Sequence, residues 1–483
     1  MNKINKNIKS INKPDNSSKK NKSISYIALA LMSFISVWNF SNATNGFGYF
    51  EGSRSIIPWI ITLILYFMPF LLITAELCSV FKDEAGGIGS WTLRTLGPKF
   101  AFFAGWIYWV INIPYISQKV NFVAVAINWA TEQNASISDY PVWNVQVGCF
   151  IIFVIAVLIA CRGVSIISKI STVAGIASFS MSILYIILTL SAPLLTNGNI
   201  HPIEFKLENF MPKDMSFIFN ISILIFALGG TERIATYTKS VKDPARDFPR
   251  GLKLTIAMVS ISCVFSTIAM QMMFESNISS DFITNGQYQA FEILGSYYNV
   301  GQLFLIIFAI SNALQQFAVI ILSLDIPIRV MLSSADKKYY PSGLFKKNKN
   351  GCYINGMILQ FCLVSIFIVL PVLGLDNVDI MVKWIIKLNS VCMPLSSVLV
   401  FIIYIIVRLK PSKFPNSGYK MIKSKRLALI IGCICLFINV FAIVFGMYDD
   451  NLFGLLTNIL APFVLASIGL IMPVLAKIER RKK

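Results

Sequence analysis

The chain has 483 residues, of which 56% are hydrophobic and 13% are charged, and its mean hydropathy is +0.69. A water-soluble globule of this length would have far too little polar surface for its exterior, so the composition predicts a membrane protein. The formal net charge of +19 lies mostly between the apolar runs. That distribution is typical of membrane topology and argues against a nucleic-acid partner.

Twelve apolar segments are long enough to cross the hydrocarbon core, which takes roughly 20 residues per helix. The first five lie at residues 24–50, 56–80, 100–130, 142–160 and 167–193. The next five lie at 215–237, 252–274, 300–326, 354–374 and 380–407, and the last two at 427–447 and 452–476. The sequence thus predicts an all-α polytopic membrane protein with units at 24–193, 215–409 and 425–476, between basic tails at 1–23 and 477–483.

Lysine and arginine are distributed unevenly between the loops. If the N-terminus is cytoplasmic, the external loops hold only Arg54, Lys206 and Lys213, and most of the 42 Lys and Arg residues face the cytoplasm. The positive-inside rule then predicts a multi-pass plasma-membrane protein with both termini in the cytoplasm. The tail at 1–23, rich in Lys, Asn and Ser, is expected to be disordered and to serve as a topological anchor, or to contact anionic lipid.

Residues that could carry enzyme or metal chemistry are sparse. The nine cysteines lack CxxC spacing and sit mostly within apolar segments, as small core residues do, and His201 is the single histidine. No nucleotide-binding loop, nucleophile elbow or haem motif occurs. We therefore expect no cofactor, no metal site and no enzymatic activity.

Two apolar segments are interrupted by small and polar residues, and each opens one half of the chain. The interruptions are SNATNG at 41–46 and ALGGTE at 227–232. Paired interruptions of this kind indicate a transporter's central site, because a broken helix exposes backbone groups that must line a polar cavity. The alternative is that they are packing glycines and ordinary kinks.

The dipoles of the broken helices suggest a receptor for a zwitterion. Free N–H groups at the second half of helix 1 would favour a carboxylate, and free carbonyls at the end of the first half of helix 6 would favour an ammonium group. The candidate carboxylate-binding residues are Ser41, Asn42, Ala43 and Thr44. The candidate ammonium-binding residues are Ala227, Leu228 and Gly229.

Several segments in a fixed order resemble the signatures of one transporter group. Residues 67–77 are FMPFLLITAEL, residues 84–91 are EAGGIGSW, residues 96–100 are LGPKF, and residues 242–250 are KDPARDFPR. Together they resemble the amino acid/polyamine/organocation (APC) superfamily of permeases, and within it the glutamate/GABA antiporter branch.

The resemblance implies a LeuT-like fold, in which helices 1–5 and 6–10 form inverted repeats and two further helices follow. It places the substrate between helices 1, 3, 6, 8 and 10, with Phe226 as an aromatic gate and with Asn112 and Ser323 facing the site. Two departures stand out. Many members have G-S-G at the helix 1 break, which this chain lacks, and some proton-coupled members carry a lysine where it has Ser178, which favours exchange.

Ionisable residues inside membrane spans are costly and therefore functional candidates. Glu76 and Asp325 lie near cytoplasmic helix ends, where we expect them to pair with basic residues as gates or structural contacts. Glu232 follows the helix 6 break and could hold the unwound segment, titrate during transport, or pair with Arg233 or Lys239.

Three lysines also lie within predicted spans. Lys387 is a coupling candidate, because about two turns into helix 10 it could meet a substrate carboxylate. We expect Lys119 and Lys383 to snorkel outward or to pair locally.

The sequence predicts an amino acid permease that works by alternating access as an antiporter. Its expected partners are the lipid bilayer, an amino acid substrate, and a counter-substrate or proton. One alternative is a cation or organic-amine carrier of the same fold, in which Glu232 binds charge directly. Others are a non-transporting amino acid sensor, and an enzyme or a channel, for which we find no catalytic cluster or filter motif. The sequence does not indicate the oligomeric state.

Overall fold

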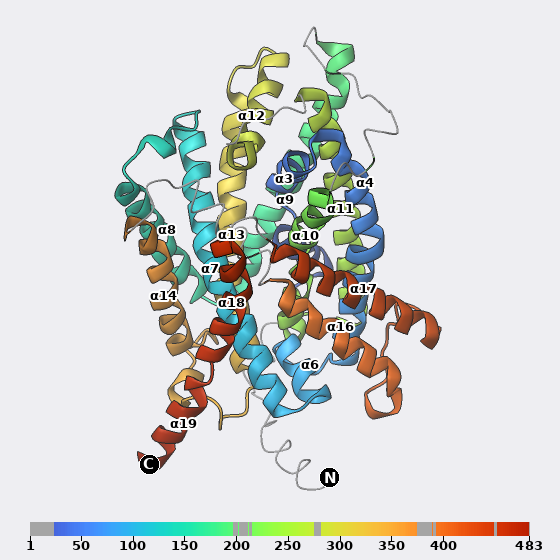
Figure 1. Ribbon diagram of the computed structural model, residues 1–483, viewed down its shortest axis with the longest axis vertical. Coiled ribbons are helices and arrows are strands. Elements are labelled where there is room, and N and C mark those ends of the chain that lie inside the picture. The colour runs from blue at the N-terminus through green and yellow to red at the C-terminus, as the bar shows by residue number, and fades with distance from the viewer. Residues whose placement is uncertain are drawn as a thin grey trace.

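The computed structural model describes residues 24–196, 201, 211, 215–274, 282–373, 389, 393–448 and 452–482. These residues are mostly helical and contain no β-strand, only the isolated bridges between Ile24 and Val241 and between Lys347 and Tyr353 (Figure 1). Among them, ten helices are long and apolar enough to cross a membrane. The predicted segments at 215–237 and 380–407 are not among the ten, and most of 380–393 lies outside the described residues.

The first half of the chain follows the predicted spans closely. Its elements are α2 (Tyr26–Val37), α3 (Ser41–Tyr49), η2 (Gly52–Ser55), α4 (Ile56–Thr62), η3 (Leu63–Phe67), α5 (Met68–Val80), α6 (Ile88–Thr95), α7 (Pro98–Thr131), η4 (Ser136–Asp139), α8 (Val142–Ala160) and α9 (Val164–Leu195). Helices α4 and α5 are continuous through η3, a π-helical turn. The short helix α6, which contains much of the EAGGIGSW segment, was not predicted.

The second half contains the second predicted interruption, a last span divided into two helices, and one helix that was not predicted. Its elements are α10 (Met215–Ala227), η6 (Thr231–Ser240), α11 (Pro244–Met273), α12 (Phe282–Tyr297), α13 (Leu303–Leu332), η7 (Ser342–Phe345), α14 (Ile354–Val369), η8 (Leu370–Leu373), α16 (Pro394–Leu409), η9 (Pro411–Lys413), α17 (Lys425–Gly446), α18 (Leu452–Ile468) and α19 (Ile471–Lys482). The predicted last span is thus two helices, and helix continues through most of the predicted basic tail. Helix α12, which was not predicted, lies at the opposite end of the molecule from α6 and α19 (Figure 1).

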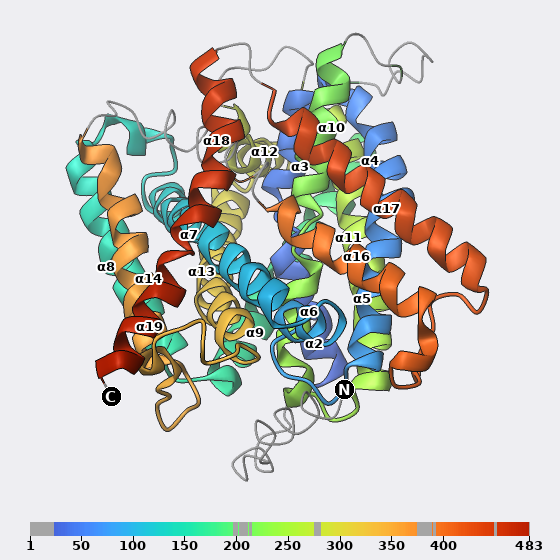
Figure 2. The same cartoon turned by 60° about the horizontal axis from the view of Figure 1, so that its bottom comes forward.

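The centre of the bundle is formed by α7 and α13, which pack against each other along much of their lengths (Figure 2). Helix α11 packs on α2 and α5, and α9 packs on both α2 and α13. The peripheral helices expose large apolar side chains, among them Leu158 on α8 (64% exposed) and Phe437 on α17 (70%). Apolar surface of this kind fits contact with lipid rather than with water.

Both predicted interruptions exist, but the first lies nearer the N-terminus than expected. Residues 38–40 separate α2 from α3, and residues 41–46, predicted as the break, are helical. The reason is local, because the side chain of Asn39 accepts a hydrogen bond from the Ser41 backbone N–H (2.9 Å) and so caps the new helix. The second interruption, at 228–230, is where the sequence predicts it, and Gly230 has the left-handed φ of +87°.

Candidate functional site

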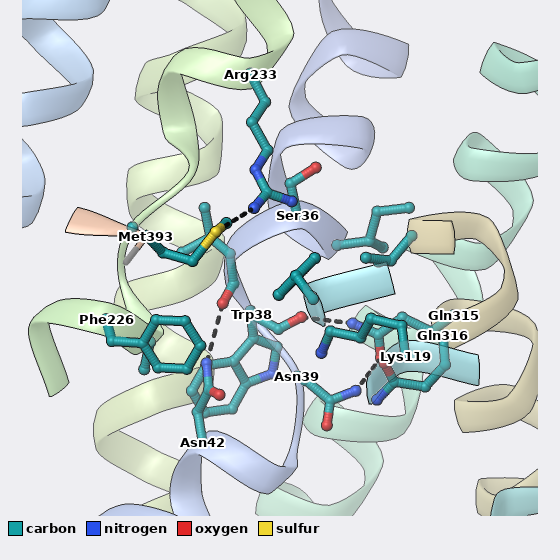
Figure 3. A pocket seen from close by; sticks show the side chains of 16 residues that line it. Ser36, Trp38, Asn39, Asn42, Lys119, Phe226, Arg233, Gln315, Gln316 and Met393 are labelled. Atoms are coloured by element: carbon teal, nitrogen blue, oxygen red, sulfur yellow. Dashed lines mark hydrogen bonds between the residues drawn. The ribbon is translucent and has the colours of Figure 1, made fainter. Parts of the chain in front are cut away.

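The two interruptions meet at one cavity inside the bundle (Figure 3). It is lined by Ile35, Ser36, Val37, Trp38, Asn39, Asn42, Tyr115, Lys119, Phe226, Ala227, Gly229, Arg233, Gln315, Gln316, Val319 and Met393. These residues come from the α2–α3 junction, α7, the end of α10, η6, α13 and the turn before α16. The cavity volume is about 60 Å³, where one water molecule needs roughly 10–15 Å³, so the space suits a small solute.

At the end of α10 the chain presents backbone carbonyls to this region. Within the described residues, no hydrogen bond reaches the carbonyl oxygens of Ala227, Leu228 or Gly229. The N–H of Gly229 turns back to the Phe226 carbonyl (3.0 Å), which ends the helix. The C-terminal end of α10 therefore offers carbonyl oxygens and the negative end of a helix dipole, both suited to a cation such as an ammonium group.

At the start of α3 the expected free N–H groups are already used, which corrects the prediction for Ser41, Asn42 and Ala43. The N–H of Ser41 is bound by the Asn39 side chain, that of Asn42 by the Asn39 carbonyl (2.8 Å), and that of Ala43 by the Phe40 carbonyl (3.0 Å). A carboxylate here would meet the dipole of α3 and the amide of Asn42, which lines the cavity and donates to the Val37 carbonyl (3.0 Å).

A network of amide side chains fixes the α2–α3 junction against α13. Asn39 donates to the side-chain oxygens of Asn312 (3.0 Å) and Gln315 (3.1 Å). Gln315 in turn donates to the Trp38 carbonyl and accepts from the Ser178 hydroxyl (2.8 Å). Ser178 is thus part of this neutral network.

Two cations line the cavity. The guanidinium carbon of Arg233 lies 4.5 Å from the centroid of the Tyr115 ring, and the Lys119 ammonium lies 5.2 Å from the same centroid. Arg233 is 4% exposed and contacts the Ser323 hydroxyl (3.4 Å) and the Met393 sulfur (3.7 Å). Among the lining residues there is no carboxylate, so the cavity is net positive.

Glu232 lies next to Arg233 in sequence but outside the cavity lining. It is 2% exposed, and its Oε1 accepts a hydrogen bond from Ser396 (3.2 Å), while its Oε2 has no partner among the described residues. An ion pair with Arg233 or Lys239, one of the alternatives for Glu232, is not found within the part of the chain that the structure describes. The same part holds no group of three or more His, Cys, Asp or Glu residues that could bind a metal ion.

The predicted site residues are only partly brought together. Asn42, Phe226, Ala227 and Gly229 line the cavity, and Ser323 touches it through Arg233. Five more are buried but do not line it, namely Ser41, Ala43, Thr44, Leu228 and Asn112. Lys387 lies outside the described residues. Asn112 donates to the Tyr108 carbonyl of its own helix (2.6 Å).

Sequence reasoning missed Lys119, Asn39, Gln315 and Gln316 as lining residues and weighed Arg233 only as a partner of Glu232. Lys119 was expected to snorkel outward or to pair locally; it extends into the cavity, beside the rings of Tyr115 and Phe122 of its own helix (Figure 3). Arg233 and Lys119 could have been identified from the free-energy cost of a charge inside a membrane span, because such a cation normally faces a cavity or a partner.

The ion pairs expected for Glu76 and Asp325 are present. Glu76 is bound by Arg408 (2.7 Å), and Asp325 is bound by Arg329 (2.6 Å) and by the hydroxyl of Tyr237 (2.9 Å). Each pair therefore satisfies a buried carboxylate, as the sequence predicts.

Comparison with known proteins places the chain in a family. The family model described as amino acid permease matches residues 22–470. The chain is 38% identical to the aspartate/glutamate permease AcaP of Lactococcus lactis, over 95% of this chain and 97% of that protein. It is 28% identical to the inner membrane transporter YjeM of Salmonella typhimurium (74% of this chain, 76% of YjeM), and 25% identical to a glutamate/gamma-aminobutyrate antiporter of L. lactis (63% and 60%). The chain therefore belongs to the amino acid permease family of the APC superfamily and is a multi-pass membrane protein.

Proposed function

We propose that this protein is an antiporter for acidic amino acids that works by alternating access around the cavity between the interrupted helices. The observation that carries the proposal is that both interruptions line one net-positive cavity. The names of two relatives, an aspartate/glutamate permease and a glutamate/gamma-aminobutyrate antiporter, support the substrate class and the exchange mode.

In this proposal the substrate lies across the two helix breaks. Its ammonium group meets the carbonyls of Ala227, Leu228 and Gly229, which have no hydrogen-bond partner within the described residues. Its α-carboxylate lies at the N-terminal end of α3 beside Asn42, where the helix dipole and the side-chain amide stabilise a negative charge. Phe226, which lines the cavity at the end of α10, is the candidate gate.

The proposed architecture is twelve membrane helices with inverted repeats of the LeuT type. The first repeat runs from α2 to α9 and the second from α10 to α16, followed by α17 to α19. The support is that each repeat opens with an interrupted helix, at 38–40 and at 228–230. We further propose a plasma-membrane location with both termini in the cytoplasm, which follows from the distribution of Lys and Arg.

Counterflow in proteoliposomes tests the function directly. The full-length chain is reconstituted, the vesicles are loaded with unlabelled L-glutamate, and uptake of radiolabelled L-aspartate is measured at two pH values. We expect aspartate uptake to depend on internal glutamate. Leucine, lysine and γ-aminobutyrate, added outside the vesicles, should inhibit this uptake only weakly. Aspartate uptake at the same rate into vesicles without internal glutamate would overturn the exchange mechanism. Transport of amines that lack a carboxylate would favour the organic-amine carrier. Binding of aspartate without counterflow would favour the sensor.

A further inference from the structure

The cavity contains a charge arrangement that binding of an α-amino and an α-carboxylate group does not use. Lys119 and Arg233 both lie beside the ring of Tyr115, and no lining residue carries a compensating carboxylate. Two cations so close together, Arg233 buried and Lys119 half-buried, repel each other and lose hydration, which costs free energy unless an anion lies between or beside them. Such a pair is therefore expected to serve an anionic group.

The side chains that contact Arg233 hold its guanidinium group in place and carry no charge, and the adjacent buried Glu232 acts on it through the field without forming an ion pair within the described residues. Its protein contacts are neutral, namely the Ser323 hydroxyl at 3.4 Å, the Met393 sulfur at 3.7 Å and the Tyr115 ring. Its Nε is buried and has no hydrogen-bond partner among the described residues. A guanidinium group with unused donors and fixed orientation is suited to bind a carboxylate through two parallel hydrogen bonds.

The backbone at the helix 6 interruption is shaped around this side chain. Gly230 has a left-handed φ of +87°, and a Cβ atom there would lie 3.0 Å from Nε and 3.4 Å from Cδ of Arg233. Glycine at this position therefore permits the guanidinium group to lie directly against the unwound segment. The same segment presents the carbonyl groups of Ala227 and Gly229.

Lys119 supplies the second charge from a different helix. It lies one turn after Tyr115 on α7, and its ammonium group is 5.2 Å from the ring centroids of both Tyr115 and Phe122. No ion pair of Lys119 is found within the described residues. Figure 3 shows Lys119 and Arg233 entering the cavity from separate elements, with Asn42 and Phe226 on its remaining sides.

We infer that Arg233 and Lys119 form a subsite for the side-chain carboxylate of a dicarboxylic amino acid, apart from the main-chain groups bound at the helix interruptions. This inference rests on the proposed function and deepens it, because it assigns the selectivity for acidic substrates to two named residues. Arg233 binds the carboxylate through its guanidinium fork, and Lys119 balances the second unit of negative charge that a dicarboxylic substrate carries.

The test compares glutamate with glutamine, which differ only at the side-chain terminus. Counterflow and ligand-induced shifts in melting temperature are measured on the full-length protein for wild type, Lys119→Gln and Arg233→Gln. We expect each substitution to lower the glutamate-to-glutamine preference by roughly 10- to 100-fold, as for loss of a hydrogen bond to a charged group. We expect Lys119→Arg, which keeps the charge, to retain most of the preference.

Lys253→Gln is the matched control. Lys253 also lies over a tyrosine ring, that of Tyr419 at 5.6 Å, but it is exposed and does not line this cavity. Its substitution should leave the preference unchanged. An unchanged preference in folded Lys119→Gln would overturn the subsite, and that variant decides the matter if Arg233→Gln does not fold. Absence of any amino acid exchange by the wild type would instead overturn the proposed function.

Discussion

A guanidinium nitrogen of Arg408 on α16 donates to a carboxylate oxygen of Glu76 on α5 over 2.7 Å, although 332 residues separate the two in sequence. Both side chains are buried, at 8% and 2% exposure. The same Glu76 oxygen accepts from the Met421 backbone N–H (2.9 Å), and Arg408 also donates to the Ile422 carbonyl (2.8 Å). The pair therefore fastens the segment after α16 to the end of α5.

Breaking this pair should destabilise the protein strongly. Arg408→Met leaves the Glu76 carboxylate buried without its cation, which costs about 3–5 kcal/mol. We expect a clear fall in melting temperature in detergent, partly restored by adding Glu76→Gln, which removes the unpaired charge. Lys338→Met is the control, because its pair with Asp336 (3.0 Å) is largely exposed and should contribute at most about 1 kcal/mol. Equal losses in the two single variants would contradict the argument.

A bulky side chain at Gly229 should abolish transport without preventing insertion. Gly229 lines the cavity, and a Cβ atom there already lies 3.2 Å from the Phe226 carbonyl oxygen. Gly229→Phe is therefore expected to fill the substrate space and to reduce counterflow to background, while the protein remains monodisperse in detergent. Gly148→Phe on α8, where a Cβ atom meets nothing within 4 Å, should transport normally. Normal uptake by folded Gly229→Phe would count against the site.

The cap of α3 can be tested with two asparagines that make the same local contact. Asn39 binds the N–H of Ser41 (2.9 Å), and Asn134 binds the N–H of Ser136 (2.8 Å). Asn39 is buried and also donates to Gln315, so Asn39→Ala leaves buried polar groups without partners. We expect this to lower the free energy of unfolding by about 1–3 kcal/mol. Exposed Asn134→Ala should change the free energy of unfolding by about 0.5 kcal/mol or less. Thermal or SDS denaturation distinguishes them, and similar effects would argue against a structural role for the α3 cap.

Gly89 should not tolerate a methyl group. It lies on α6 against the Val330 carbonyl of α13, and a Cβ atom there would approach that oxygen more closely than real Cβ atoms do. Gly89→Ala is expected to push α6 from α13 and to cost about 1–3 kcal/mol, seen as a lower melting temperature. Gly148→Ala, with open space around it, should be neutral or slightly stabilising. A neutral Gly89→Ala would mean that α6 shifts freely.

The thiols of Cys161 and Cys352 lie 3.9 Å apart in loops beyond the ends of α8 and before α14. The hydrogen bond from Cys352 lowers the pKa of Cys161 to about 7. Because the thiolate is the nucleophile, the alkylation rate of Cys161 should rise with a midpoint near pH 7. Cys352→Ala should move this midpoint up toward the ordinary thiol value of about 8.5. Mass spectrometry of iodoacetamide adducts measures both profiles, and identical profiles would contradict the assigned cause.

Much of the fold follows from hydropathy alone. The segment predicted at 142–160 is α8 (Val142–Ala160), because its run is mostly apolar, carries no charged residue and ends just before Arg162. Helices α6 and α12 were not predicted, since each is short, partly polar and lies in a predicted loop. The predicted break in helix 1 began three residues too late along the chain. The contact that sets its position is the Asn39 cap, and the small polar residues at 41–46, which were interpreted as a break, are equally compatible with a buried helix.

The site was harder to predict than the fold. Reasoning from helix dipoles identified the free carbonyls of Ala227 to Gly229, because the end of a helix is determined by the local sequence. It could not locate Lys119, because which face of α7 meets α13 is decided by packing between distant segments. The amide Gln315 was missed for the same reason, since its hydrogen-bond partners Trp38 and Ser178 lie in helices 1 and 5.

The tight winding of η6 lengthens helix 6. A 3₁₀-helix rises about 2.0 Å per residue and an α-helix about 1.5 Å, so the ten residues Thr231–Ser240 extend roughly 20 Å instead of 15 Å. With the 13 residues of α10 adding roughly 20 Å, this interrupted span gains about 5 Å over an unbroken α-helix of the same residues. In the proposed architecture the chain would cross the bilayer here with about three residues fewer, and any rewinding of η6 into α-helix would shorten this segment by about 5 Å.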